Sequence, residues 1–197
     1  MDRIKISKIL YILVIALCSL SVLYIYTRIN SPYNLIFLII VCIAFLIPGR
    51  IQRYYYKDFY TGRKLLSRNR YEQSVEYFES FLQQIKQRPW IKKMIWFSWG
   101  IYTNDIEVMT YNNMGVAMLY LRQYNQSKEY LTKALKLDSR YPLPYHNLAI
   151  LFVLEGNMVL AEKYYNDSVD LGYKGTSFDK FISKVGTIYA NIQGEKL

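Results

Sequence analysis

The sequence has few of the residues that disulfide frameworks, metal sites and active sites require. Of its 197 residues, two are cysteine and one is histidine. Both cysteines, Cys18 and Cys42, lie inside apolar runs, where cysteine behaves as a small apolar residue. Because there is no Cys/His cluster, a structural zinc site is excluded, and we predict no metal and no other cofactor.

The short motifs of catalysis are also absent. The sequence has no Gly-rich phosphate loop, no HExxH-type pair and no nucleophile elbow. Paired acids such as Asp167 and Asp170 fall on a predicted helix surface, where water solvates them. We therefore predict that the chain is not an enzyme, has no catalytic residues and takes no small-molecule substrate.

The net charge of +10 is unevenly distributed. Residues 1–103 contain 15 Lys and Arg against 5 Asp and Glu, a balance of 15 − 5 = +10, whereas residues 104–197 contain 10 of each. This asymmetry predicts that the first half of the chain meets an anionic partner.

The chain begins with a basic stretch, residues 1–8, that precedes an uncharged apolar run, Ile9–Tyr26. As a helix, these 18 residues measure about 27 Å, close to the thickness of a bilayer core. A cleaved signal peptide is disfavoured, since Thr27–Asn30 offers no small-residue cleavage site. A lipoprotein box ending at Cys18 is disfavoured because Leu17 occupies the place of a small residue. We predict an uncleaved transmembrane helix over 9–26.

A short link, 27–34, leads to a second apolar run, Leu35–Ile47, which ends at Pro48-Gly49. This run measures about 20 Å as a helix, and flanking aromatic residues extend the predicted transmembrane helix to 35–51. A re-entrant segment is the alternative. Basic residues flank both runs on their outer sides, so the positive-inside rule places both termini in the cytoplasm and the link outside.

The region from Val108 to Gly175 contains one pattern twice. Gly115 corresponds to Ala149 at an offset of 149 − 115 = 34. Further residues correspond at the same offset: Tyr111 and Tyr145, Asn113 and Asn147, Met114 and Leu148, Ser127 and Ala161, Leu137 and Leu171. Small residues at repeated positions allow helices to cross closely, and large apolar residues fill the space between copies.

This period and these residue types resemble the tetratricopeptide repeat (TPR), a pair of antiparallel helices. The resemblance implies an all-α fold: two N-terminal transmembrane helices, then an α-solenoid with repeats at 108–141 and 142–175. A degenerate copy is predicted at 55–88, with Gly62 in the place of Gly115 and the large Phe81 where a small residue is usual. Apolar residues at helical spacing predict a capping helix and tail over 176–197.

An aromatic insertion, 89–107, separates the degenerate copy from the clear pair. The favoured interpretation is that it packs on the repeat core; the alternative is a segment at the membrane interface. The residues that would face the interface are Trp90, Lys92, Lys93, Trp96, Phe97 and Trp99. Nucleic-acid binding by these aromatic and basic residues is not expected.

In the tetratricopeptide family the inner faces of the first helices form a concave groove that receives a peptide or a partner helix. The resemblance maps this groove to twelve residues of this chain: Met109, Asn112, Asn113, Val116, Leu119, Tyr120, Leu143, His146, Asn147, Ile150, Val153 and Leu154. These residue types favour an amphipathic helix or an extended apolar peptide. The alternative is that the chain itself fills the groove, with Trp90–Tyr102 or with the C-terminal helix.

These features predict a membrane-anchored scaffold or adaptor that holds a protein partner at the cytoplasmic membrane face. The alternative is a structural subunit or assembly factor of a membrane complex, held mainly through its transmembrane hairpin. In that case Cys18, Ser19 and Ser21 would lie at a helix–helix interface.

Overall fold

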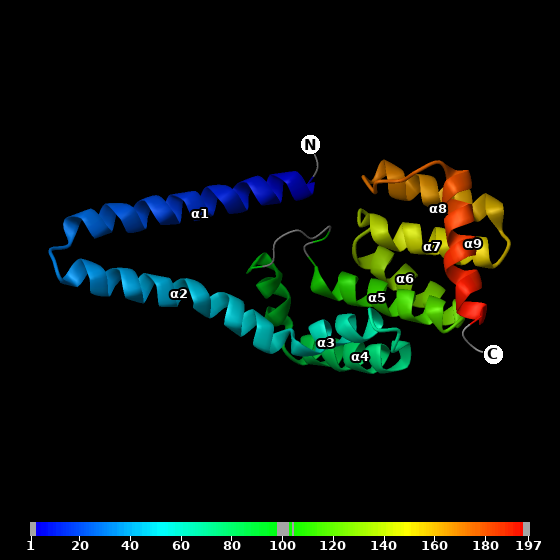
Figure 1. Cartoon of the computed structure of the whole chain (residues 1–197), viewed down its shortest axis with the longest axis horizontal. Coiled ribbons are helices and arrows are strands. Elements are labelled where there is room, and N and C mark those ends of the chain that lie inside the picture. Colours follow the sequence, from blue (N-terminus) through cyan, green and yellow to red (C-terminus); the bar gives the residue numbers. More distant parts are fainter. Residues whose placement is uncertain (1–2, 98–102, 104, 195–197) are drawn as a thin grey trace.

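The computed structural model describes residues 3–97, 103 and 105–194, and within these residues every regular element is a helix. Two long helices extend away from a stack of helix hairpins, and the last helix crosses that stack (Figure 1). The elements in chain order are α1 (Arg3–Arg28), α2 (Tyr33–Tyr55), α3 (Lys57–Leu66), α4 (Tyr71–Gln87), the 3₁₀-helical η1 (Pro89–Phe97), α5 (Ile106–Tyr120), α6 (Tyr124–Leu137), α7 (Pro142–Leu154), α8 (Met158–Asp170) and α9 (Phe178–Gly194). The predicted all-α architecture is confirmed.

Helices α1 and α2 lie antiparallel (Figure 1), and most of their large apolar side chains are exposed. Leu17 and Leu46 expose 64% and 61% of their surface. Both helices are long and apolar enough to cross a membrane, and their apolar windows are not buried against the rest of the chain. They therefore differ from a core helix of a globular domain, whose apolar side chains are buried.

Helix α2 continues past the predicted segment 35–51 and past Pro48, which we expected to end the apolar run. Proline lacks the N–H that a helix interior needs, and this normally kinks or ends a helix. Here the turns after Pro48 continue because they are held by the repeat domain. The buried Gln52 donates from Nε2 to the Met94 carbonyl oxygen at 2.9 Å.

Tyr56, the residue between α2 and α3, makes a second hydrogen bond to the repeat domain. Its hydroxyl donates to the carbonyl oxygen of Ile91 in η1 at 3.0 Å, and its side chain is 1% exposed. Since α3 begins at Lys57, the hairpin enters the first repeat without an intervening loop.

The three helix pairs α3–α4, α5–α6 and α7–α8 share one turn geometry. Asn69, Arg122 and Gly156 have φ values of 60°, 59° and 77°. Their spacings, 156 − 122 = 34 and 122 − 69 = 53, match the repeat period and the period plus the 19-residue insertion. After each of them, the next N–H donates to the carbonyl five residues earlier, which is the hydrogen bond of a Schellman helix ending. The degenerate copy therefore forms the same hairpin as the clear pair.

Close helix crossing explains the glycines of the first two copies. A methyl group on Gly115 would lie 2.6 Å from the Leu131 side chain, and one on Gly62 would lie 2.7 Å from the Phe78 ring. Both glycines meet the residue 16 positions further along the chain, since 131 − 115 = 78 − 62 = 16. The equivalent approach in two copies supports the alignment from which the repeats were predicted.

Phe81 occupies the position at which the later copies have Ala134 and Ser168. Its ring is fully buried, with its centroid 5.4 Å from that of Tyr56 and 5.5 Å from that of Phe59. The large side chain is therefore accommodated, because the end of α2 and the start of α3 pack around it.

Most of the described part of the predicted insertion, 89–107, forms η1, and its last two residues already belong to α5. Ile91, Met94 and Ile95 are buried in the same core cluster as Tyr56 and Phe81. The side chains of η1 that pack on the repeat core are thus aliphatic or thioether, whereas the interpretation drawn from the sequence concerned the aromatic rings, of which Trp90 is 47% exposed.

We predict that Gly115→Leu lowers the melting temperature of the full-length protein in detergent, followed by circular dichroism. A side chain here must displace Leu131, so the expected loss of stability is about 1–3 kcal/mol or more, with Gly115→Ala intermediate. Gly186→Ala in α9 is the control, since a methyl group there meets no atom within 4 Å. An unchanged melting temperature for Gly115→Leu would contradict the close crossing.

Candidate partner-binding surface

The twelve side chains predicted to line a groove lie on α5 and α7, the first helices of the two clear repeats. The structure separates them into buried residues, residues covered by α9, and residues that remain partly open. Leu119 is 1% exposed and belongs to the core. Leu143 packs against the cluster formed by Val108, Ala134 and Tyr141.

Two of the predicted groove amides bind each other. Asn147 donates from Nδ2 to Oδ1 of Asn112 at 2.9 Å, and Asn112 is 4% exposed. This bond joins α7 to α5, so part of the amides' hydrogen-bonding capacity holds the two repeats together. Asn113, the next residue on α5, stays half-buried at the surface.

Helix α9 covers the inner face of α7. Ile150, Val153 and Leu154 pack against the cluster that contains Phe181 and Val185 of α9. On α7, the C-terminal helix thus fills the predicted groove, as in the alternative in which the chain itself occupies it.

His146 lies under the start of α9. Its ring centroid is 4.2 Å from that of Tyr173 and 5.1 Å from that of Phe181. Burial, with a smaller effect from Lys184, lowers the pKa of His146 to about 4. A neutral imidazole among aromatic rings contributes to packing, and among the described residues its Nδ1 has no hydrogen-bond partner.

A column of tyrosine rings connects α9 to the earlier helices. Tyr120 of α5 stacks on Tyr71 of α4, with centroids 4.7 Å apart, and on Tyr189 of α9, with centroids 5.3 Å apart. Burial raises the pKa of Tyr189 well above its usual value, as expected for a phenol packed between other side chains. Tyr120 is therefore part of the contact that seats α9.

The concave surface that remains partly open lies on α3 and α5. Met109, Asn113 and Val116 are half-buried on α5. Moving Asn113 and Val116 back by 53 residues leads to Tyr60 and Arg63 on α3, both of which are exposed. The sequence reasoning omitted these two residues, although the 53-residue offset between Gly62 and Gly115 could have located them.

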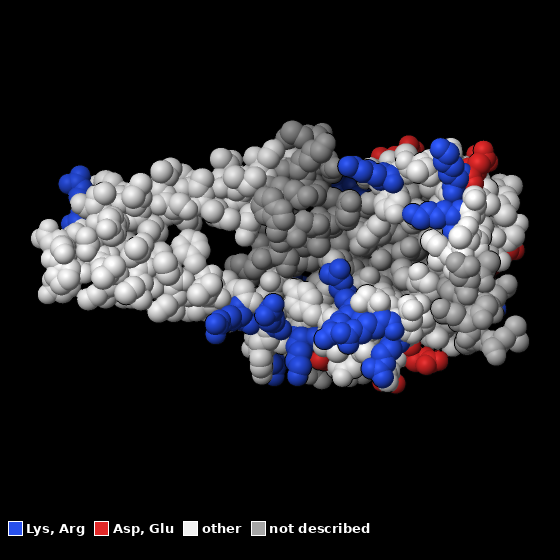
Figure 2. All heavy atoms as spheres, in the orientation of Figure 1, with Lys and Arg blue, Asp and Glu red and all other residues white. Residues whose placement is uncertain are grey.

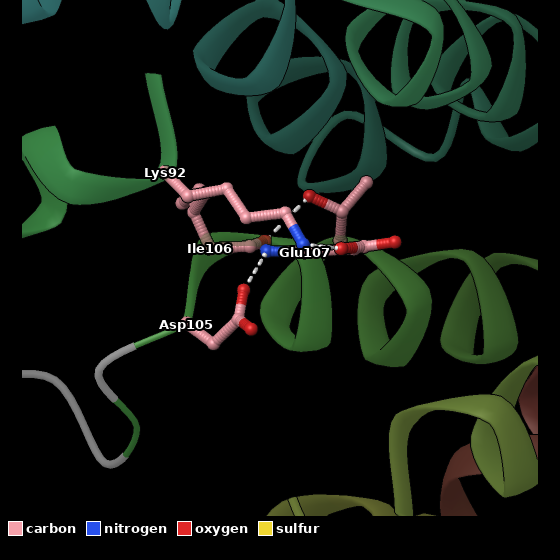
Figure 3. A network of polar contacts seen from close by, with 5 residues as sticks. Lys92, Asp105, Ile106 and Glu107 are labelled. Atoms are coloured by element: carbon pink, nitrogen blue, oxygen red, sulfur yellow. Dashed lines mark hydrogen bonds and ion pairs between the residues drawn. The ribbon is translucent and has the colours of Figure 1, made fainter. Parts of the chain in front are cut away.

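The predicted membrane-interface residues have different surroundings. Trp90 is 47% exposed, and its ring packs edge-on against Tyr55 at the end of α2. Lys93 is exposed, whereas Lys92 forms an ion pair with Glu107 (Figure 3). Trp99 and the side chains of Trp96 and Phe97 lie outside the described residues.

The contact of Lys92 belongs to a group of polar bonds at the start of α5. Asp105 accepts the backbone N–H of Glu107 at 2.8 Å and so caps the helix (Figure 3). Thr103 donates to Asp138 at 2.7 Å, which ties the insertion to the end of α6. The ion pair of Lys92 therefore joins η1 to α5, so its ammonium group is bound to a carboxylate of this chain.

Among the described residues, no three His, Cys, Asp or Glu side chains gather as metal ligands would. The repeat fold itself is typical of non-enzymatic interaction scaffolds. Exposed side chains on α3 and half-buried side chains on α5 thus leave a surface of the kind that binds another protein.

Comparison with protein families matches residues 110–141 to the tetratricopeptide repeat, which covers most of α5 and all of α6. A search of curated proteins found no match. The shared hairpin turns and the glycine crossings extend the same geometry to the neighbouring helix pairs. The chain therefore contains a tetratricopeptide repeat, with helix pairs of similar geometry on both sides of it, and carries a hairpin of two apolar helices at its N-terminal end.

Proposed function

We propose that the protein is a membrane-anchored scaffold that holds a protein partner on the concave surface of its repeats. The observation that carries this proposal is the direct passage from α2 into α3, which attaches an exposed apolar hairpin to a peptide-binding type of fold. A binding domain built onto its anchor in this way presents its surface at a set position relative to the bilayer.

Membrane anchoring is supported by the exposure of the hairpin. In water, side chains such as Leu17, Leu20 and Leu46 would leave a large apolar surface unpartnered, whereas lipid chains cover it favourably. The basic residues after Pro48 favour a cytoplasmic location for the repeats.

The packing of α9 indicates which kind of partner the concave surface would accept. It is an amphipathic helix that buries Phe181 and Val185 against α7. We propose that a partner helix or peptide uses the adjoining open part, where Val116 and Met109 offer apolar area and Asn113 offers an amide. An amide can donate and accept together, so it can bind a peptide backbone whatever the side chains of the ligand.

The topology is tested with single cysteines at Asn30 and Ser139 in a chain in which Cys18 and Cys42 are replaced. We predict that an impermeant thiol reagent labels Asn30→Cys in intact cells and labels Ser139→Cys only after the membrane is opened. Reaction of Ser139→Cys in intact cells would contradict the cytoplasmic placement of the repeats.

Partner binding is tested by purifying the full chain in mild detergent and quantifying co-purified proteins by mass spectrometry. We predict that Val116→Asp nearly abolishes recovery of the partner, because it places an unpaired charge in the contact. Asn113→Ala should weaken binding by about 1–3 kcal/mol, the cost of leaving a buried polar group unpaired. Val159→Asp is the matched control, since Val159 is 81% exposed on α8.

Two results would count against this use of the concave surface. Equal partner recovery from the folded Val116→Asp variant and from the parent would exclude the α5 surface. Loss of the partner after Cys18, Ser19 and Ser21 are changed to leucine, with Val116→Asp neutral, would favour the alternative of a subunit held through its hairpin.

A further inference from the structure

An open hollow of about 710 Å³ lies where the hairpin enters the repeats. Its lining residues come from the end of α2 and from α3: Gly49, Gln52, Arg53, Lys57, Tyr60, Thr61 and Lys64. No carboxylate is among them, while three carry a positive charge and two carry a hydroxyl group. The hollow is therefore suited to an anion.

The basic side chains of the hollow lie on one continuous helical stripe. Arg53 and Lys57 are four residues apart, and Lys64 follows seven residues later, so all three return to the same face. The stripe stays continuous because only Tyr56 separates α2 from α3. Arg53, Lys57 and Lys64 are exposed, and none of them forms an ion pair with a described residue.

The position of the hollow relative to the apolar run indicates the kind of anion. Gly49 lies two residues after Ile47, the end of that run, and Arg53 follows about 6 Å further along the helix. Exposed aromatic rings occur at the same level, since Tyr54 is 74% exposed and Trp90 is 47% exposed. Aromatic residues and basic residues together mark the headgroup region of a bilayer.

The surface view agrees with this placement. Figure 2 shows Lys and Arg side chains gathered where the hairpin meets the repeats, while most of the hairpin surface in this view is uncharged. In the segment 50–70 seven Lys and Arg stand against one acid, Asp58, whose Oδ2 accepts the Ser80 hydroxyl. Positive charge is thus concentrated at the end of α2 and in α3, where the hairpin joins the repeats.

We propose that this hollow binds the headgroup of an anionic phospholipid of the membrane leaflet next to the repeats. The lipid phosphate lies between Arg53, Lys57 and Lys64, and the hydroxyls of Tyr60 and Thr61 donate to its oxygens. Gly49 leaves the entrance from the bilayer open, because a methyl group built there meets no atom within 4 Å. This inference rests on the proposed membrane anchoring and adds a lipid class to it.

The proposal is tested on the full-length protein, purified in neutral detergent and mixed with either phosphatidylglycerol or phosphatidylcholine. Bound lipid is counted by native mass spectrometry. We expect preferential retention of phosphatidylglycerol. Because each basic residue near an anionic headgroup contributes severalfold, the variant Arg53→Gln/Lys57→Gln/Lys64→Gln should lose this retention by about 10- to 100-fold.

The control variant, Arg68→Gln/Arg70→Gln/Arg88→Gln, removes the same charge from exposed positions outside the hollow and should change retention by less than about twofold. Gly49→Phe fills the entrance without changing the charge and should also lower retention. An equal loss in the control, or full retention by Gly49→Phe and by the hollow variant when both are folded, would overturn the site.

Free phosphate is the competing source of the same chemistry. If inorganic phosphate raised the melting temperature as much as phosphatidylglycerol does, the lipid assignment would be wrong. Failure of this proposal is separable from failure of anchoring: a chain that resists alkaline extraction from membranes but shows no lipid preference contradicts only the lipid site. A chain released by alkaline extraction contradicts the anchor itself.

Discussion

Gln52, on the last turn of the long apolar helix α2, and Tyr56, the residue that follows this helix, are buried and donate hydrogen bonds to carbonyl oxygens of η1. A buried polar side chain is stable only when it is paired, so these bonds specify one seating of α2 on the repeat core. The helix therefore passes Pro48, α3 follows directly, and Phe81 obtains the aromatic neighbours that fill its position. The position of the hairpin relative to the repeats depends on this contact.

The same seating links the two proposed binding surfaces. Tyr60 lines the basic hollow, and by its repeat position it also borders the open concave surface. A partner on α3 and α5 would then lie beside the headgroups that the hollow faces. Under the proposed anchoring, such a partner would contact the bilayer and the repeats together.

Helix α9 occupies the other end of the concave surface. The stacked rings of Tyr71, Tyr120 and Tyr189 connect it to the first and second repeats, and its apolar face covers α7. Terminal repeats need such a cover, because a helix pair exposes on its outer side the surface that a further copy would bury. This cover leaves open only the part of the concave surface on α3 and α5, next to the hairpin.

The sequence by itself determined the elements whose signals are local. The 34-residue period, the glycines at close crossings, the two apolar runs and the amphipathic C-terminal helix follow from residue spacing alone. Local spacing cannot reveal which of several compatible surfaces meet. The Asn112–Asn147 bond, the seating of η1 on α2 and the cover of His146 by α9 were decided by the tertiary structure. Each of these contacts depends on a distance between helices, which packing sets and periodicity does not encode.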